Sequence, residues 1–486
     1  MRMQQVRMFG LSVTLSALAT VAWAGELQVA TATIDITPKL PVAVTGQFNL
    51  RIATQAETPL TANVLVLQSQ TDGKPGDCAV IVSCDLVAAP PEILEAVRQA
   101  VRKRLPDLDT QKIFMAGTHT HTAPVLEPGV YPIPETGVTQ VAEYHAFLAE
   151  RVSEAIERAW NARKPGSVTW GLGHAVVAYN RRASYADGRS QMYGPTDVPD
   201  FRGLEGYEDH DINSLFVWNS EGKLISIAVN VSCTAQEVEG RSTVNADFWH
   251  PVRKRLHARY GEEVCVLGLI GAAGDQSPHL MYRKAADDRM TTLRGLDRMD
   301  EIARRIDRAV DEAYEAVKND RHADAVLAHG VEKLQLPGRL VLEPEYKEAK
   351  AACEEAAAQM AKDPKSAEQV MRRLKWYEVT VQRFEKQAAN PHPTFDAEIH
   401  AVRIGDAAIC TNPFELFTDY GIRIKARSPA VQTFVVQLVG EGTYLPTEKA
   451  VQGGHYSAIV HSGMVGPEGG QILVDRTVEL LKSLWK

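Results

Sequence analysis

The sequence predicts an α/β fold, with mixed sheets and flanking helices in a single large domain that carries a helical insertion. Three observations lead to this prediction. The chain has 486 residues, 45% of them hydrophobic, which is enough for one large core or two modest ones. Apolar, β-rich runs alternate with amphipathic helical patterns along most of its length. Two of these runs end in glycine-containing loops that carry histidine, aspartate or serine.

A strand–helix–strand unit precedes the first of these loops. Residues 78–86 are an apolar, β-rich run, residues 91–104 have a helical pattern, and residues 113–116 are again strand-like. The histidines that follow therefore lie just beyond the carboxyl end of a strand, where open α/β sheets place their ligands.

The later elements are predicted from the same periodicities. They are a helix over 141–163, strands around 168–179, a hairpin over 214–231, a strand over 263–270, a helical stretch over 290–318, a hairpin over 399–411, a helix after Pro413, a strand over 432–439 and a C-terminal amphipathic helix over 472–485. The insertion, residues 340–390, is highly charged and reads as a helical hairpin broken near Pro364. It is either a lid or packing arm, or a solvated insertion without a role in chemistry.

The N-terminus has the pattern of a signal peptide. Two arginines precede the apolar run 8–21, and Ala22-Trp23-Ala24 resembles a cleavage site. We expect cleavage after Ala24, which leaves residues 25–486 as the mature domain, secreted or periplasmic. The alternative is a membrane anchor, but the run is shorter than the roughly 20 residues that a span requires. No other stretch is apolar enough to cross a bilayer.

Charge and cysteine content restrict the class of partner. The net charge of −8 and the absence of a Lys/Arg cluster argue against a nucleic-acid partner. The six cysteines are widely spaced, mostly inside apolar strand-like runs. They are typical of small buried residues and not of a disulfide framework.

The first candidate site is Gly117-Thr118-His119-Thr120-His121. In an extended backbone His119 and His121 would point to the same side, within reach of one metal ion or of a metal and a substrate. The alternative is a pair of hydrogen-bonded core histidines. Placement in a loop after a strand favours a site.

Two further segments carry candidate groups. The loop 274–278 places Asp275 and Ser277 at a glycine-permitted turn, which is either part of a site or an ordinary Asp/Ser turn. Glu415 lies among apolar residues at the expected start of a helix. Because an unpaired buried carboxylate is costly, it requires a metal or a cation, unless it only interacts with the helix dipole.

Four motifs in order resemble the neutral/alkaline ceramidases: residues 116–124, the loop 274–278, Asn412-Pro413-Phe414-Glu415 and Tyr444-Leu445-Pro446-Thr447. The resemblance covers the chain from about Leu27 onwards. It implies a zinc site to which His119, Glu415 and Tyr444 contribute. It also implies a catalytic role for His121, an active-site serine at Ser277, a substrate-positioning arginine at Arg181 and a second site tyrosine at Tyr456.

The sequence departs from the family pattern in two places. Where the family has a second zinc histidine, residues 230–237 contain none. Cys233 could supply a thiolate in its place, Glu237 or His250 could supply the ligand, or the metal has three protein ligands or none. The family also continues into a further β-rich C-terminal domain, which we do not find here, and this leaves the lipid substrate open.

The sequence thus predicts a secreted zinc-dependent hydrolase of N-acyl amides, acting on a ceramide-like lipid or another small-molecule amide. A metal-bound water is the expected nucleophile; a serine mechanism at Ser277 is less favoured, because no G-x-S-x-G elbow is present. The alternatives are a non-catalytic envelope protein that binds a ligand in the same cleft and a hydrolase of another amide or ester.

Overall fold

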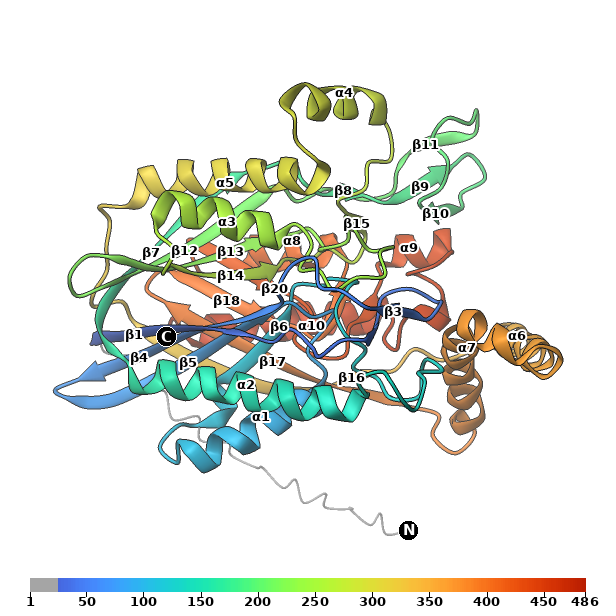
Figure 1. Cartoon of the computed structure of the whole chain (residues 1–486), viewed down its shortest axis with the longest axis horizontal. Coiled ribbons are helices and arrows are strands. Elements are labelled where there is room, and N and C mark those ends of the chain that lie inside the picture. The colour runs from blue at the N-terminus through green and yellow to red at the C-terminus, as the bar shows by residue number, and fades with distance from the viewer. Residues whose placement is uncertain (1–24) are drawn as a thin grey trace, which may run out of the picture.

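The computed structural model describes residues 25–486, and the predicted signal peptide lies outside the described residues. Figure 1 shows helices on the top and bottom of the molecule with β-strands between them. No helix in the described part of the chain is long and apolar enough to cross a membrane. The predicted class, a mixed α/β fold with several sheets, is confirmed.

The largest sheet has eight strands. In spatial order they are β14 (Cys265–Ile270), β13 (Leu224–Val231), β12 (Asp211–Asn219), β7 (Lys164–His174), β1 (Glu26–Asp35), β4 (Thr61–Thr71), β5 (Lys74–Cys84) and β6 (Ile113–Gly117). Neighbours are antiparallel except at the two edges, where β13 pairs with β14 and β5 with β6 in parallel. The sheet bends so strongly that the edge strand β14 also contacts β4, β5 and β6.

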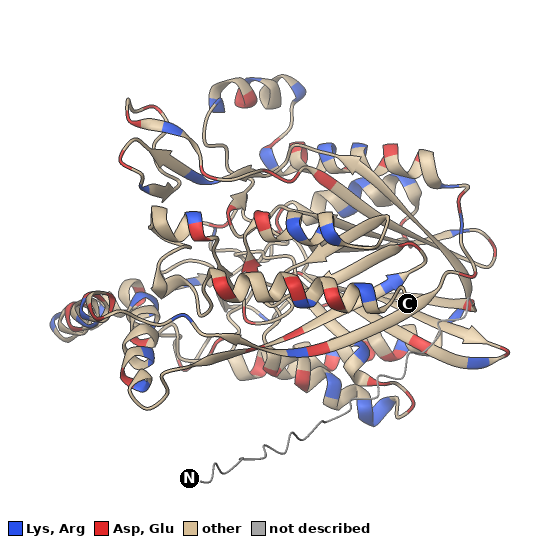
Figure 2. Ribbon diagram, turned by 180° about the vertical axis from the view of Figure 1, so that it is seen from behind, with Lys and Arg blue, Asp and Glu red and all other residues tan. Residues whose placement is uncertain are grey.

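Four helices cover the outer faces of this bent sheet. Two of them, α1 (Pro91–Arg104) and α2 (Val141–Asn161), pack on the half that contains β1, β4 and β5. The other two, α3 (Trp249–Tyr260) and α5 (Arg298–Val317), pack on the half that contains β7, β12 and β13. Figure 2 shows Lys and Arg positions interspersed with Asp and Glu positions along the ribbons of the helices.

A second sheet fills the concave side of the first. Its strands are β16 (Leu327–Pro337), β17 (Thr394–Ile404), β18 (Ala407–Thr411) and β20 (Gln432–Val436). Apolar side chains of both sheets form one buried cluster that includes Leu67, Phe114, Leu267, Ile404 and Phe434. The outer face of this second sheet is covered by α8 (Thr418–Arg427) and α10 (Pro467–Ser483).

The remaining elements lie around one end of the molecule. They are the pairs β2 (Val42–Val44) with β3 (Arg51–Ala53), β8 (Tyr179–Asn180) with β15 (Gln276–Ser277) and β19 (Phe414–Leu416) with β21 (Thr443–Leu445), the small sheet β10 (Ser190–Met192), β9 (Arg182–Tyr185) and β11 (Phe201–Leu204), and the helices α4 (Lys284–Arg294), α6 (Glu343–Lys362), α7 (Ala367–Gln387) and α9 (Glu448–Gly453). Helices α6 and α7 pack against each other and project from this end (Figure 1).

Two predicted elements differ in the structure. The helical stretch 290–318 is two helices, because Gly295 adopts a left-handed conformation that ends α4, and Asp297 caps the start of α5. The segment after Pro413 begins with the strand β19, and the helix α8 follows only at Thr418. Pairing of β19 with β21, two segments far apart in the sequence, decides this outcome.

Candidate active site

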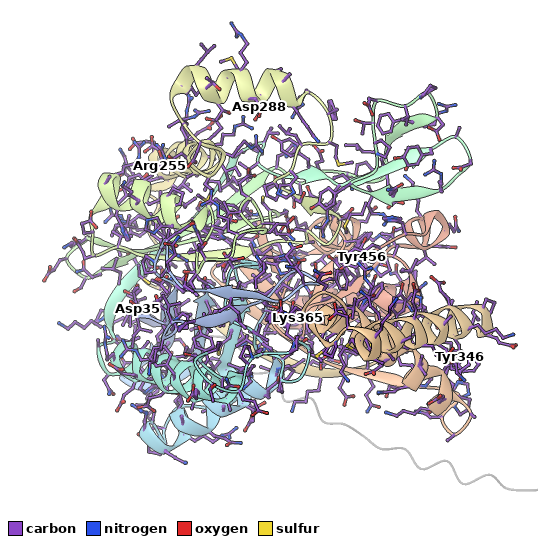
Figure 3. The ribbon with its side chains drawn as sticks, turned by 45° about the vertical axis from the view of Figure 1, so that its right-hand side comes forward. Asp35, Arg255, Asp288, Tyr346, Lys365 and Tyr456 are labelled. Atoms are coloured by element: carbon purple, nitrogen blue, oxygen red, sulfur yellow. The ribbon has the colours of Figure 1, made fainter. Side chains whose placement is uncertain are left out.

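One cavity of about 160 Å³ collects most of the predicted site residues. His119, His121, Glu415, Tyr444 and Tyr456 all line it. Its outer part is lined by the aromatic or charged side chains of Phe48, Glu127, Tyr131, Arg372, Trp376 and Glu441. Because Arg372 and Trp376 belong to α7, the helical insertion forms a wall of this cavity. Figure 3 shows Tyr456 close to that hairpin, and the rings of Tyr456 and Trp376 are 5.8 Å apart.

His119 is held by its backbone as well as by its ring. Its φ of 63° is left-handed, so the two histidines do not follow an extended strand as the sequence suggested; the backbone turns directly after β6. The His119 N–H donates to Leu86 O, and ring Nδ1 lies 2.7 Å from Val87 O. A carbonyl only accepts, so Nδ1 carries the proton and Nε2 presents a lone pair to the cavity.

A buried ion pair supports this turn from below. The carboxylate of Asp85 accepts two hydrogen bonds from Arg253, at 2.7 and 2.9 Å, and a third from the Thr118 hydroxyl. Asp85 is fully buried and Arg253 nearly so. The residue directly before His119 is therefore attached to a charged pair in the core, which restricts its motion.

His121 lies against His119 at the wall of the cavity. The two Nε2 atoms are 3.2 Å apart and the rings are edge-on. A Cβ built on Gly46, whose φ is +95°, would lie 2.4 Å from Cγ of His121. Only glycine therefore fits beside this ring, both sterically and in backbone conformation.

Glu415 reaches the cavity from the strand β19. The parallel pairing of β19 with β21 sets Glu415 opposite Tyr444. Glu415 Oε2 lies 3.5 Å from His119 Nε2 and 3.9 Å from Arg181 Nη2, and this oxygen has no hydrogen-bond partner among the described residues. Burial raises the pKa of Glu415 to about 7, although the guanidinium of Arg181 opposes the shift. The helix-start interpretation of this residue was wrong, because it lies in a strand.

The two tyrosines adjoin Glu415. Their rings are 5.7 Å apart, and the Tyr444 hydroxyl accepts a 3.2 Å hydrogen bond from Arg181 Nη2. Burial, together with the nearby carboxylate of Glu415, raises the pKa of Tyr444 well above its usual value and that of Tyr456 to about 12. Both hydroxyls are therefore protonated at neutral pH and can donate hydrogen bonds in the cavity.

Arg181 lies behind the cavity and does not line it. Its guanidinium is fully buried and donates to Tyr444, to Gln236 Oε1 at 3.2 Å and to Gly274 O at 3.0 Å. It therefore connects the strand that carries Tyr444 with the loop after β14. In this structure its contacts are those of a group that positions other side chains.

Ser277 is buried in the strand β15. Its hydroxyl accepts a 3.2 Å hydrogen bond from the backbone N–H of His279, and among the described residues no hydrogen bond joins it to His121. Asp275, two residues earlier, accepts from Asn180 and from the backbone and hydroxyl of Thr418. Asp275 thus ties the Ser277 loop to the segments that carry Arg181 and Glu415.

Cys233, the predicted replacement ligand, does not line the cavity, and neither do the alternatives Glu237 and His250. Cys233 is completely buried in the apolar cluster under α3 and α5, and its Sγ lies 3.4 Å from Val177 O. Burial raises the pKa of the thiol well above its usual value, which disfavours a thiolate. From the same segment it is Gln236 that reaches the site, with Nε2 3.0 Å from His121 Nε2.

Three residues that contact His121 were not predicted from the sequence: Gln236, Glu239 and Gly46. The first two lie in or beside the stretch 230–237, where only a replacement metal ligand was sought. A Gln-x-x-Glu spacing after a strand has no distinctive signal of its own. Gly46 belongs to a loop that precedes the histidines by more than seventy positions, so nothing local connects it to them.

The donor set is compatible with a metal ion. His119 Nε2 offers a lone pair, Glu415 Oε2 is buried without a hydrogen-bond partner among the described residues, and Tyr444 lies opposite Glu415 in the strand pairing and lines the same cavity. The proton of His119 Nδ1 is held by a carbonyl, as is usual behind a metal-bound imidazole. No group of three or more His, Cys, Asp or Glu side chains suited to a metal ion is found in residues 25–486. The third donor is a tyrosine, and His119, Glu415 and Tyr444 fit a site with three protein ligands.

The sequence of the chain matches no protein-family model, and no curated protein matches it significantly. Solved structures with a similar fold include the following two. A neutral ceramidase from Pseudomonas aeruginosa aligns with a TM-score of 0.68 and 15% identity over 94% of this chain and 74% of its own. A ceramidase complexed with C2 aligns with a TM-score of 0.66 and 15% identity over 95% and 75%. At this identity the likeness concerns the fold, and it agrees with the four sequence motifs: the chain has the fold of the neutral ceramidases.

Proposed function

We propose that this protein is a metal-dependent hydrolase of N-acyl amides, with a ceramide-like lipid as its substrate, and that it acts outside the cytoplasm after removal of a signal peptide. One observation carries the proposal. Among the described residues Glu415 Oε2 is buried without a hydrogen-bond partner, 3.5 Å from Nε2 of His119, in a cavity that Tyr444 and His121 also line. An unpaired buried carboxylate oxygen is costly, and a metal ion bound at this position would offset that cost.

In this proposal His119, Glu415 and Tyr444 would hold the metal, which we take to be zinc. Bound there, zinc would supply Lewis acidity toward the amide carbonyl and toward water. The side chains of the chain have the remaining roles. His121 takes a proton from the attacking water and gives it to the leaving amine, the protonated Tyr456 donates to the oxygen on which charge develops, and Arg181 keeps Tyr444 and Glu415 in place.

Ser277 has a supporting role in this scheme. Its hydroxyl is occupied by the N–H of His279 and has no contact with His121 that would activate it as a nucleophile. We therefore expect Ser277→Ala to retain most of the turnover. His121→Ala should lose about 10²–10⁴-fold, the usual contribution of general acid–base catalysis.

The size of the cavity bears on the substrate. At about 160 Å³ it is smaller than the roughly 300–1,000 Å³ of pockets that enclose a drug-sized ligand. For a ceramide-like lipid, only the part around the amide would enter, and the chains would lie along the outer wall that includes Phe48 and Trp376. The small cavity also favours a second candidate, a hydrolase of a smaller amide or ester.

The test uses the purified protein, loaded with zinc or stripped by a chelator, on short- and long-chain ceramides, N-acyl amino acids and acyl esters. We expect turnover of long-chain N-acyl amides that requires the metal and is lost in His121→Ala. Turnover of short amides or esters alone would select the second candidate. An absence of turnover across the panel by metal-loaded protein would contradict both and leave a binding protein with this fold.

A further inference from the structure

Glu239 lies beside His121 and is not among the residues that the sequence motifs pointed to. Its carboxylate comes from the loop after β13, two residues beyond the stretch in which a second ligand histidine was expected. Glu239 Oε2 is 3.3 Å from His121 Nδ1 and 3.1 Å from Gln236 Nε2, and Oε1 is 3.8 Å from His279 Nδ1. The side chain is three-quarters buried, at 23% exposed.

The orientation of the Gln236 amide determines which nitrogen of His121 carries the proton. Arg181 Nη1 lies 3.2 Å from Gln236 Oε1, and a guanidinium has no acceptor atom, so the amide oxygen must face it. The Thr234 hydroxyl also donates to this oxygen, at 2.5 Å. The amide NH₂ therefore faces the opposite way, toward His121 and Glu239.

An NH₂ group that points at His121 Nε2 requires a lone pair on that nitrogen. His119 Nε2, 3.2 Å away, is compatible with this lone pair once its own is bound to a metal ion. The proton of a neutral His121 then resides on Nδ1, and the acceptor that Nδ1 faces is Glu239 Oε2. At 3.3 Å the contact is long, and Nδ1 has no well-aligned hydrogen bond among the described residues. A catalytic hydrogen bond of this kind often tightens only when substrate binds.

The ring and the carboxylate are fixed to the same scaffold. Arg51, itself buried, donates to the backbone carbonyl of His121 at 2.7 Å and to that of Glu239 at 2.6 Å. Gly46 packs against the imidazole ring on another side. One guanidinium thus sets the distance between the two residues, independently of their side-chain contact.

We propose that Glu239 is a positioning residue that holds the Nδ1–H tautomer of His121, so that Nε2 keeps the lone pair toward which the Gln236 amide points. This rests on the proposed function both for its consequence in turnover and for the metal ion that occupies the lone pair of His119. The arrangement has the same logic as a carboxylate that orients the histidine of a hydrolytic triad.

The test compares Glu239→Ala and Glu239→Asp with the matched control Glu237→Gln. Glu237 belongs to the same segment, but its carboxylate pairs with Arg298, 3.4 Å away, and not with a histidine. Glu239→Ala should lower kcat about 10²-fold and leave KM within about twofold of the wild-type value, because proton transfer becomes slower while substrate binding is unchanged. Glu239→Asp, which keeps the charge, should recover part of kcat, and Glu237→Gln should change neither constant by more than about twofold.

A second measurement reads the tautomer directly. In zinc-loaded, ¹⁵N-histidine-labelled protein at fixed neutral pH, the His121 signal, assigned from its absence in His121→Gln, should show a proton on Nδ1 in the wild type and a shift toward Nε2–H in Glu239→Ala. A wild-type proton on Nε2, an unchanged tautomer in Glu239→Ala, or equal losses of kcat in the Glu239→Ala and Glu237→Gln variants would overturn the proposal. If the protein hydrolyses no amide, the function fails while the tautomer assignment is still decided by this spectrum.

Discussion

Substitution of Glu415 by glutamine should stabilise the metal-free protein at alkaline pH while abolishing its activity. Burial raises the pKa of this carboxyl from 4.5 to about 7. A group whose pKa is raised on folding contributes stability that is fully present below its unfolded pKa and lost as the pH rises through the folded value. The stability in question is therefore lost between about pH 4.5 and about pH 7.

The magnitude follows from the shift. About 2.5 pKa units at 1.36 kcal/mol per unit correspond to about 3 kcal/mol in total. Part of this is already lost at pH 5, so the loss between pH 5 and pH 8 is about 2.5 kcal/mol. The side chain is only 9% exposed, so solvent screening reduces this value little. Glutamine has no charge to bury and should not show the loss.

The assay is urea unfolding of chelator-treated wild type and Glu415→Gln at pH 5 and pH 8, since a bound metal would keep the carboxylate ionised. The variant should gain about 2.5 kcal/mol relative to wild type between the two pH values. Glu221→Gln, in the exposed turn between β12 and β13, is the control and should show no such gain. A Glu415→Gln variant that is less stable than wild type at pH 8 would refute the reasoning, because it would mean that the carboxylate is well paired without a metal.

Three further predictions concern other parts of the site. Gly46→Ala should displace the His121 ring and lower kcat at least tenfold. The control is Gly73→Ala, where the glycine is also left-handed, at φ +74°, but has open space around it; this variant should leave kcat unchanged. Equal kinetics of the two variants would contradict the packing argument. Trp376→Ala should raise KM for a long-chain substrate about tenfold with little change in kcat, which corresponds to a loss of about 1.4 kcal/mol of binding free energy. Trp376→Phe should largely restore KM, and an unchanged KM in Trp376→Ala would exclude α7 from the substrate-binding wall. Asp85→Asn should lower the free energy of unfolding, measured with urea, by about 3–5 kcal/mol, because the arginine that pairs with this carboxylate stays buried without its partner. A decrease below about 1 kcal/mol would contradict that account.

Much of the local structure was predictable from the sequence. The helix 91–104 has the predicted bounds in α1, because Pro91 at its first position and basic residues in its last turn mark its ends. The hairpin of β12 and β13 forms around Asn219, whose side chain accepts from the backbone of the turn. The sequence order of the four motifs likewise indicated the ceramidase-like fold, which the structural comparison confirms.

The sequence by itself determined most of the segments that become helices and strands and which residue types could form a site, since hydrophobic periodicity and turn residues act over a few positions. Only the tertiary structure decided which side chains meet. Glu415 faces Tyr444 because β19 pairs with β21, Cys233 points into the core while Gln236 three residues later reaches His121, and Glu239 meets the same ring through a shared arginine. These contacts join residues that are up to 188 positions apart. Their geometry depends on how the bent sheet and its loops pack, which no local pattern encodes.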